Sequence, residues 1–276
     1  MVIDFHTHIV PPRMKEDRGL CLGKDPFFHV LYAPRSRLAT AEELIASMDQ
    51  AGVDVSVILN MGWTSHELCV ETNDYILEAI ARYPRRLVGL GSLLPQAGDK
   101  ALRELERLVK GGIRGLGELR PEVQGFGPRD LEPLAPVLQK HRLLLMFHAS
   151  EPVGHPYPGK GKSTPDLLYP FLTACPEITF VLAHWGGGLP FFALMPEVAQ
   201  ALKNTWFDTA ATRFLYRPAI YQHAGQIAGW DKILFGTDFP LLSQKKCLEE
   251  VRSLDLEEEK KAQILGANAQ KLLGLA

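Results

Sequence analysis

The sequence lacks the features that mark several classes of protein. Only four cysteines occur among its 276 residues and none forms a C-x-x-C pair, which excludes a disulfide framework and favours reduced thiols in a cytoplasm. The charges nearly cancel, with 30 Lys and Arg against 32 Asp and Glu, so the basic excess of a nucleic-acid-binding protein is missing. No apolar run approaches the roughly 20 residues of a membrane span, and no signal-peptide pattern precedes the first apolar segment. We therefore predict a cytoplasmic protein with neither nucleic acid nor membrane as a partner.

Several catalytic and nucleotide-binding motifs are also missing. No Gly-rich dinucleotide fingerprint follows the first apolar segment, and no G-x-S-x-G occurs. The stretch GKGKS (159–163) fails as a P-loop because Pro156 stands where the first glycine is required. The stretch SHELCVE (65–71) fails as H-E-x-x-H because Val70 stands where the second histidine is required. These absences argue against a P-loop NTPase, a zincin peptidase and a serine hydrolase.

What the sequence does contain is a regular alternation of apolar segments and helical patterns. Hydrophobic residues make up 46% of the chain, which is enough to bury a large core. Apolar segments that alternate with amphipathic helices favour parallel strands, and eight such units in a chain of about this length suit a TIM-like (β/α)8 barrel of about 250 residues. We predict a single barrel domain over residues 1–276, with a doubly wound open sheet as its rival. The eight segments are residues 1–10, 53–60, 86–94, 112–120, 142–149, 178–186, 205–211 and 231–239.

Local signals indicate where some of the helices begin and end. Thr40 is a suitable N-cap for a helix over residues 40–52, because Glu43 follows three residues later and Gly52 supplies a C-terminal stop. The patterns of residues 73–84 and 99–112 predict two further helices.

Two long connections and one apolar stretch have no helical or strand pattern. Residues 11–36 and 152–165 are rich in Pro and Gly, and we expect them to be loops over the barrel mouth that act as lids or binding elements. The triple glycine 186–188 predicts a tight turn. The apolar stretch 188–196 packs either against a partner subunit, which would make the protein a homo-oligomer, or into the interior.

Polar residues interrupt the apolar segments at their C-terminal ends. His6 and His8 share one face of the first strand, because side chains alternate along a strand. In a barrel these strand ends meet at one rim, which is where barrel enzymes keep their active sites. Imidazoles and carboxylates that meet there can bind one or two divalent ions, with zinc the first choice and manganese the second. The competing interpretation is that each residue packs in the core with its hydrogen bonds made inside the protein. The six residues are His6, His8, Glu118, His148, His184 and Asp238.

Four motifs, in this order, resemble those of a known enzyme family. DFHTHIVP (4–11), FHA (147–149), AHWGGGLPFF (183–192) and FGTDFP (235–240) are similar to motifs of the metal-dependent amidohydrolase superfamily. The likeness is to the amidohydrolase-related branch that contains aminocarboxymuconate semialdehyde decarboxylase, and it covers nearly the whole chain. The resemblance implies a barrel in which the metal is bound by His6, His8, His148 and Asp238. It also implies that His184 lies beside the metal as a general acid/base or a substrate-polarising group.

Glu118, in GLGELR, departs from the pattern of that decarboxylase, which has no metal-binding counterpart there. A glutamate on the fourth strand does serve as a ligand in the similar TatD-type hydrolases. Glu118 is therefore a fifth ligand, a bridge to a second ion, or a barrel residue paired with Arg120. We count it among the candidate metal ligands.

The ligand set predicts a metal-dependent hydrolase. A divalent ion with an open position lowers the pKa of bound water toward neutrality, Asp238 is suited to accept the proton of that water, and His184 is suited to act as general acid. The expected substrate is a small-molecule ester, lactone or amide. Two alternatives use the same residues: non-oxidative removal of CO2 from an unsaturated or aromatic carboxylic acid, and a catalytically inactive metal-binding barrel.

Cationic residues near the expected rim favour an anionic small-molecule substrate. They follow the first, fourth and fifth strands, although each is also interpretable as a solvated surface charge. His155, in the loop after the fifth strand, either contacts the substrate or is an exposed loop histidine. The cationic candidates are Arg13, Arg120, Lys160 and Lys162.

Overall fold

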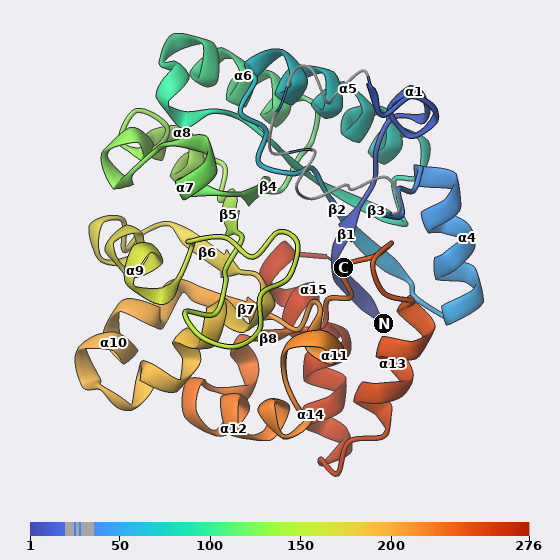
Figure 1. The fold of residues 1–276 in the computed structure, drawn as a ribbon, viewed down its shortest axis with the longest axis vertical. Helices are drawn as coiled ribbons and strands as arrows, with labels where there is room; N and C mark the ends of the chain where they lie inside the picture. The colour runs from blue at the N-terminus through green and yellow to red at the C-terminus, as the bar shows by residue number, and fades with distance from the viewer. Residues whose placement is uncertain (20–24, 26–27, 29–35, 276) are drawn as a thin grey trace.

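The predicted (β/α)8 barrel is confirmed by a computed structural model, which describes residues 1–19, 25, 28 and 36–275. Eight parallel strands pair in the order in which they occur in the chain, and the helices surround them (Figure 1). Each predicted apolar segment contains one strand. The strands are β1 (Ile3–His8), β2 (Val55–Leu59), β3 (Leu87–Gly91), β4 (Gly115–Leu119), β5 (Leu144–Phe147), β6 (Thr179–Leu182), β7 (Thr205–Asp208) and β8 (Ile233–Leu234).

The barrel closes between β1 and the segment around β8. The Phe5 amide donates to the carbonyl of Phe235 at 2.7 Å, and the Asp238 amide donates to the carbonyl of His6 at 2.9 Å. Only two residues of this segment keep regular strand geometry, although the sequence predicts a strand over 231–239. Asp238 itself has a positive φ of 64°, so the chain turns at this residue.

The helices follow the strands in a regular order, and short 3₁₀ turns lie at Pro95–Ala97, Pro128–Leu131, Leu202–Asn204 and Trp230–Lys232, with a π-helical turn at Gln263–Ala267. The helices of the described residues are α1 (Pro12–Glu16), α4 (Ala41–Ala51), α5 (His66–Arg82), α6 (Asp99–Lys110), α7 (Pro121–Gln124), α8 (Ala135–Lys140), α9 (Pro165–Ala174), α10 (Pro196–Ala201), α11 (Thr212–Leu215), α12 (Ala219–Ala228), α13 (Gln244–Arg252), α14 (Glu258–Ala262) and α15 (Asn268–Leu273).

The predicted helix ends agree with the structure in one case and differ in another. Thr40 and Glu43 form a capping box at the start of α4, and Gly52 ends the helix in the left-handed region with φ 76°. The helix predicted over 73–84 begins earlier, because the Ser65 hydroxyl accepts the amide of Leu68 and caps α5 at His66.

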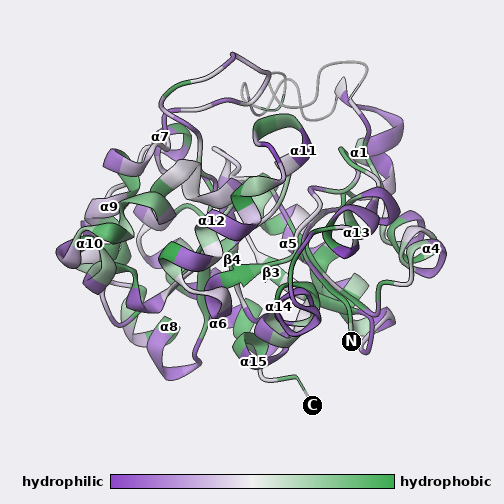
Figure 2. Cartoon of the chain, turned by 90° about the horizontal axis from the view of Figure 1, so that it is seen from below, coloured by the Kyte–Doolittle hydropathy of each residue, from purple (hydrophilic) through white to green (hydrophobic). Residues whose placement is uncertain are grey.

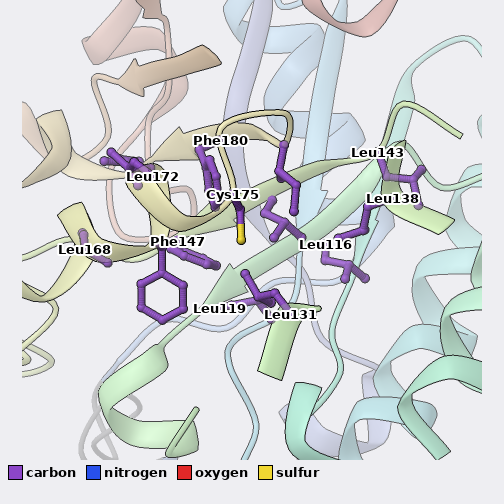
Figure 3. Packing of buried hydrophobic residues seen from close by; sticks show 14 of the residues in the cluster. Leu116, Leu119, Leu131, Leu138, Leu143, Phe147, Leu168, Leu172, Cys175 and Phe180 are labelled. Carbon is purple, nitrogen blue, oxygen red and sulfur yellow. The ribbon is translucent and has the colours of Figure 1, made fainter. Parts of the chain in front are cut away.

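Two buried clusters hold the strands in place. In the first, side chains of β4, β5 and β6 pack against α8 and α9, with Leu119, Phe147 and Leu168 among the contacts that Figure 3 displays. In the second, strands from opposite sides of the ring contribute to one cluster, which includes Phe5 and Met146. This second cluster fills the barrel interior, so the rim at the strand ends rests on a packed core.

The connections that follow the strands gather at one end of the molecule. In Figure 2, α1, α7 and α11 lie at that end and both termini lie toward the other. The predicted loop 152–165 lacks helix and strand until α9 begins at Pro165. The other predicted loop, 11–36, contains α1, while residues 20–24, 26–27 and 29–35 lie outside the described residues.

Among the described residues, no helix is both long enough and apolar enough to cross a membrane. The described cysteines, Cys69, Cys175 and Cys247, are buried and form no disulfide. Cys21 lies outside the described part of the chain.

Candidate metal centre

The two histidines of β1 and the aspartate that follows β8 form one group of donor atoms. His6 Nε2 and His8 Nε2 lie 3.0 Å apart, so the two side chains share one face, as the spacing predicts. Asp238 Oδ1 lies 3.6 Å from His6 Nε2 and 3.4 Å from His8 Nε2. Barrel closure produces this group, because it brings the two ends of the chain side by side.

A second group comes from the next part of the rim and surrounds Glu118. Glu118 Oε1 lies 2.8 Å from His148 Nδ1 and 3.4 Å from His184 Nε2. Glu118 Oε2 lies 3.9 Å from His8 Nε2 and 3.7 Å from the guanidinium of Arg120. Glu118 therefore joins the two groups at the centre of the rim. Its predicted approach to Arg120 is also present.

The donor atoms fit a divalent ion. Ligands bound at about 2.0–2.2 Å to such an ion lie about 3.0–3.5 Å from one another, and His6, His8 and Asp238 have separations of 3.0, 3.4 and 3.6 Å. A second set of donors, His6, Glu118 and His184, also lies within 4.8 Å. His148 approaches Glu118 instead of joining either set. Nitrogen and carboxylate oxygen donors in this combination are typical of zinc and manganese sites.

The electrostatics of the cluster favour a cation. Burial by itself raises the pKa of the Glu118 carboxyl, but His148 and Arg120 hold that pKa well below its usual value. Burial likewise opposes ionisation of Asp238, and His8, His6 and His184 lower its pKa. The pKa of His148 is lowered to about 4 by burial and by the charge of Arg120, which keeps this imidazole neutral. Burial by itself lowers the pKa of His6, but the charges of Asp208, Asp238 and Glu118 raise that pKa to about 10. The cluster therefore attracts positive charge, and a bound ion would take the place of a proton on His6.

A cavity of about 620 Å³ opens directly above these residues. Its floor contains Glu118, His148, His184 and Asp238, and its walls combine two arginines with apolar side chains. The wall residues include Arg37, Met61, Arg120, Tyr157, Phe214, Leu215, Pro240 and Leu241. Cavities of this size bind small organic molecules, and the cationic groups suit an acid.

The motifs, the fold and the site agree with a family assignment. The amidohydrolase family model, Amidohydro_2, matches residues 3–275. The chain belongs to the amidohydrolase family. This amidohydrolase is 23% identical to 2-amino-3-carboxymuconate-6-semialdehyde decarboxylase of Dictyostelium discoideum, over 99% of this chain and 91% of that relative. The predicted likeness to the branch of that decarboxylase is confirmed.

Solved structures confirm the barrel fold of this amidohydrolase. 5-Carboxyvanillate decarboxylase of Sphingomonas paucimobilis superposes with a TM-score of 0.82 at 18% identity, over 100% of this chain and 99% of that one. The enzyme of that name from Novosphingobium aromaticivorans, solved with manganese and 4-hydroxy-3-methoxy-5-nitrobenzoic acid, superposes with a TM-score of 0.77 at 18% identity, over 100% of this chain and 96% of that one.

The prediction that this chain hydrolyses an ester, lactone or amide is wrong. The relatives are named as decarboxylases, which supports the alternative reaction. The error has a chemical reason: a divalent ion beside a histidine serves water activation and decarboxylation equally, so the ligand residues do not distinguish the two reactions. The sequence predicts that Asp238 accepts a water proton during that hydrolysis, so this role no longer has a reaction to support it.

Most of the predicted cationic residues lie away from the cavity of this amidohydrolase. The side chain of Arg13 is 61% exposed and pairs with Glu71, and Lys160 donates to carbonyls of its own loop. Lys162 is exposed and outside the cavity lining, so Arg120 alone among the four candidates lines the cavity. His155 is exposed and lies at the cavity wall.

The loop 152–165 contacts residues of the candidate metal centre. The Ser150 hydroxyl lies 3.0 Å from His148 Nε2 and accepts the amide of Gly161 at 3.0 Å. Arg120 donates to the carbonyl of Gly159 at 3.2 Å. These contacts make the loop a wall of the cavity, in agreement with the predicted position over the mouth.

The stretch after β6 has both a tight turn and an exposed apolar surface. His184 through Gly188 all have positive φ values, which confirms the turn predicted from the triple glycine. Leu189 and Pro190 are buried, which agrees with interior packing, whereas most of the side chains that follow are exposed. Packing of 188–196 against a partner subunit stays a prediction. The exposed side chains are Phe191, Phe192, Leu194 and Met195.

Two functional candidates were missed by sequence reasoning. Asp208 ends β7 and lies 2.8 Å from His6 Nδ1, although the motif TWFDTAA contains it at a strand end like the other six residues. That position was the available signal. Arg37 lines the cavity, but it follows the long loop and no local pattern marks it.

Proposed function

We propose that the chain is a metal-dependent decarboxylase that removes CO2 from a small unsaturated or aromatic carboxylic acid. The observation that carries the proposal is the cluster of imidazoles and carboxylates beneath a cavity with cationic and apolar walls. The names of the relatives support the reaction class, since they act on acids of this type by name.

The metal ligands in this proposal are His6, His8, His148 and Asp238, with Glu118 as a further ligand. The separations among His6, His8 and Asp238 support three of these ligands, and His148 Nδ1 lies 2.8 Å from Glu118 Oε1 in the neighbouring group. When bound, a divalent ion supplies positive charge that holds an oxygen of the substrate and stabilises negative charge as CO2 leaves. Manganese and zinc are both candidates, and manganese is the ion named with three related structures.

The cavity supports an apolar acid as substrate. Met61, Phe214 and Leu215 offer apolar contact to a ring or an unsaturated chain, while Arg37 and Arg120 offer positive charge to anionic groups. Arg120 is 4% exposed, so its charge acts in a site with little water.

His184 supplies the proton that the reaction needs. Breaking the bond between the ring or chain carbon and the carboxylate releases CO2 and leaves the electron pair on carbon. A proton from His184 Nε2 then forms the new C–H bond, and the imidazole regains a proton from solvent. Burial alone lowers the pKa of His184, but hydrogen bonding to Glu118 and the charge of Asp238 raise it above its usual value, which favours the protonated donor.

The test is product analysis with protein loaded separately with Mn²⁺ and Zn²⁺. A panel of hydroxybenzoic, methoxybenzoic and unsaturated dicarboxylic acids is incubated in D2O, and CO2 release and product mass are recorded. We expect one deuterium at the carbon that carried the carboxylate. His184→Asn should lower turnover at least about 100-fold while metal content is unchanged.

Two outcomes would contradict the proposal. Protein that binds neither ion would exclude the metal-dependent reaction. Metal-loaded protein that releases no CO2 from any member of a broad panel would instead favour the catalytically inactive barrel. His223→Asn, on α12 outside the cavity lining, is the matched histidine control and should leave turnover unchanged.

A further inference from the structure

Asp208 occupies a position that connects three parts of the rim. It ends β7, is fully buried, and uses both carboxylate oxygens. Oδ2 lies 2.8 Å from His6 Nδ1 of β1, and Oδ1 accepts the backbone amides of His184 at 3.0 Å and Ala210 at 2.9 Å. One carboxylate thus contacts a candidate metal ligand and the backbone of the candidate proton donor.

We propose that Asp208 is the positioning residue of the metal centre, which selects the metal-binding tautomer of His6 and holds His184 beside it. The inference rests on the proposed function, because it concerns the same metal site. It adds a residue that contacts neither ion nor substrate and acts through two others.

Hydrogen-bond accounting supports the choice of tautomer. An ionised carboxylate only accepts, so its neighbour His6 Nδ1 must carry the hydrogen. The lone pair of a neutral imidazole then lies on Nε2. That nitrogen is 3.0 Å from His8 Nε2 and 3.6 Å from Asp238 Oδ1, so Asp208 directs the lone pair of His6 into the donor group. Carboxylate partners of this kind orient metal-binding histidines and increase their basicity.

His148 also lies beside a carboxylate, but the arrangement differs. Glu118 Oε1 lies 2.8 Å from His148 Nδ1, and the Ser150 hydroxyl lies 3.0 Å from His148 Nε2. Glu118 is itself a candidate metal ligand, whereas Asp208 acts on His6 from outside the donor groups. Asp208 belongs to neither set of potential metal ligands among the described residues, and its partner His6 is the residue that both sets share.

The same carboxylate also holds the backbone where His184 begins the left-handed turn. His184 has a φ of 53°, a conformation that needs support from its surroundings. Its amide hydrogen bond to Asp208 Oδ1 provides that support, while His184 Nδ1 lies 3.2 Å from the carbonyl of Ala210. Nε2 is thereby directed toward Glu118, 3.4 Å away.

The decisive variant is Asp208→Asn. The amide oxygen remains with the two backbone N–H groups, so the amide NH2 faces His6 Nδ1 and donates to it. The hydrogen of His6 then moves to Nε2 and blocks metal binding at that nitrogen. We expect a 10–100-fold loss of Mn²⁺ and Zn²⁺ affinity, measured by competition with a chromogenic chelator. Glu104→Gln, at a buried carboxylate that pairs with Asn73 and Arg107, is the matched control and should keep the parent affinity.

A spectroscopic measurement on the parent protein keeps the inference testable even where the variant fails to fold. In Zn²⁺-loaded, ¹⁵N-labelled protein, long-range ¹H–¹⁵N correlation should show the His6 hydrogen on Nδ1. A hydrogen on Nε2 of His6 would overturn the inference, as would an Asp208→Asn variant with parent affinity. A parent chain that binds neither ion would instead overturn the proposed function, and this inference with it.

Discussion

At the scale of single residues, Glu118 is the side chain whose chemistry matters most. It is 2% exposed and lies within 4 Å of His8, His148 and His184, so its carboxylate is surrounded by imidazoles. The guanidinium of Arg120 lies 3.7 Å from this carboxylate, so Glu118 can also form an ion pair. A carboxylate in this position can bind a metal ion or can neutralise the charge of Arg120. Loss of the carboxylate lowers the metal affinity of the site in the first case and leaves it unchanged in the second.

We expect Glu118→Gln to lower metal affinity at least about tenfold, because an amide is a poorer ligand than a carboxylate. His148→Ala should remove the metal almost completely, because it deletes a proposed ligand. Metal content of protein purified without chelator, followed by chelator titration, measures both. Glu122→Gln is the control, since Glu122 contacts the loop residues Lys162 and Ser163 and lies outside the cluster. Unchanged affinity in Glu118→Gln would restrict Glu118 to the ion pair.

At the scale of elements, the left-handed turn after β6 sets the position of the rim. Gly187 has a φ of 61°, and a Cβ atom there would lie 2.3 Å from the backbone carbonyl oxygen of Ser150. The turn therefore packs its backbone directly against the end of β5. Only glycine permits this approach, since both the φ value and the missing side chain are required.

Gly187→Ala should destabilise the protein more than Gly274→Ala, by about 2 kcal/mol or more, because the clash adds to the cost of a left-handed alanine. Gly274 has a nearly identical φ of 62°, and a Cβ there meets nothing within 4 Å in the described part of the chain. Urea denaturation of the two variants measures the difference. Equal destabilisation would show that the close contact with Ser150 has no energetic role.

At the scale of the whole molecule, the candidate metal centre joins distant strands. The proposed ligands come from β1, β4, the end of β5 and the segment after β8, so an ion bound by them would connect both ends of the chain with the middle. Binding that occurs only in the folded state stabilises that state by mass action.

Removal of the metal should therefore lower the melting temperature. An ion present at 100 times its dissociation constant adds about 2.7 kcal/mol, which corresponds to about 5–10 °C for a chain of this size. Calorimetry before and after chelation, with Mn²⁺ added back, measures the shift. His148→Ala is the control, because it should melt at one temperature under all three conditions. If the melting temperature of the parent chain does not change when chelator is added, the proposal that this site binds a metal ion is contradicted.

Much of the fold was predictable because its signals are local. The capping box of Thr40 and the stop at Gly52 are read from a few neighbouring residues, and both are present in α4. The eight apolar segments are likewise local, and each contains a strand. The limits of β8 were not predictable, because barrel closure and the turn at Asp238 shorten it.

The sequence by itself determined the barrel and the residues of its rim, because the periodicity of side chains and the order of strand ends are properties of neighbouring residues. Only the tertiary structure decided how those residues are oriented. Asp208 meets His6 across 202 positions of the chain, and Arg37 reaches the cavity while Arg13 stays outside it. These contacts depend on barrel closure, strand register and side-chain direction, which combine distant parts of the chain and leave no pattern along it.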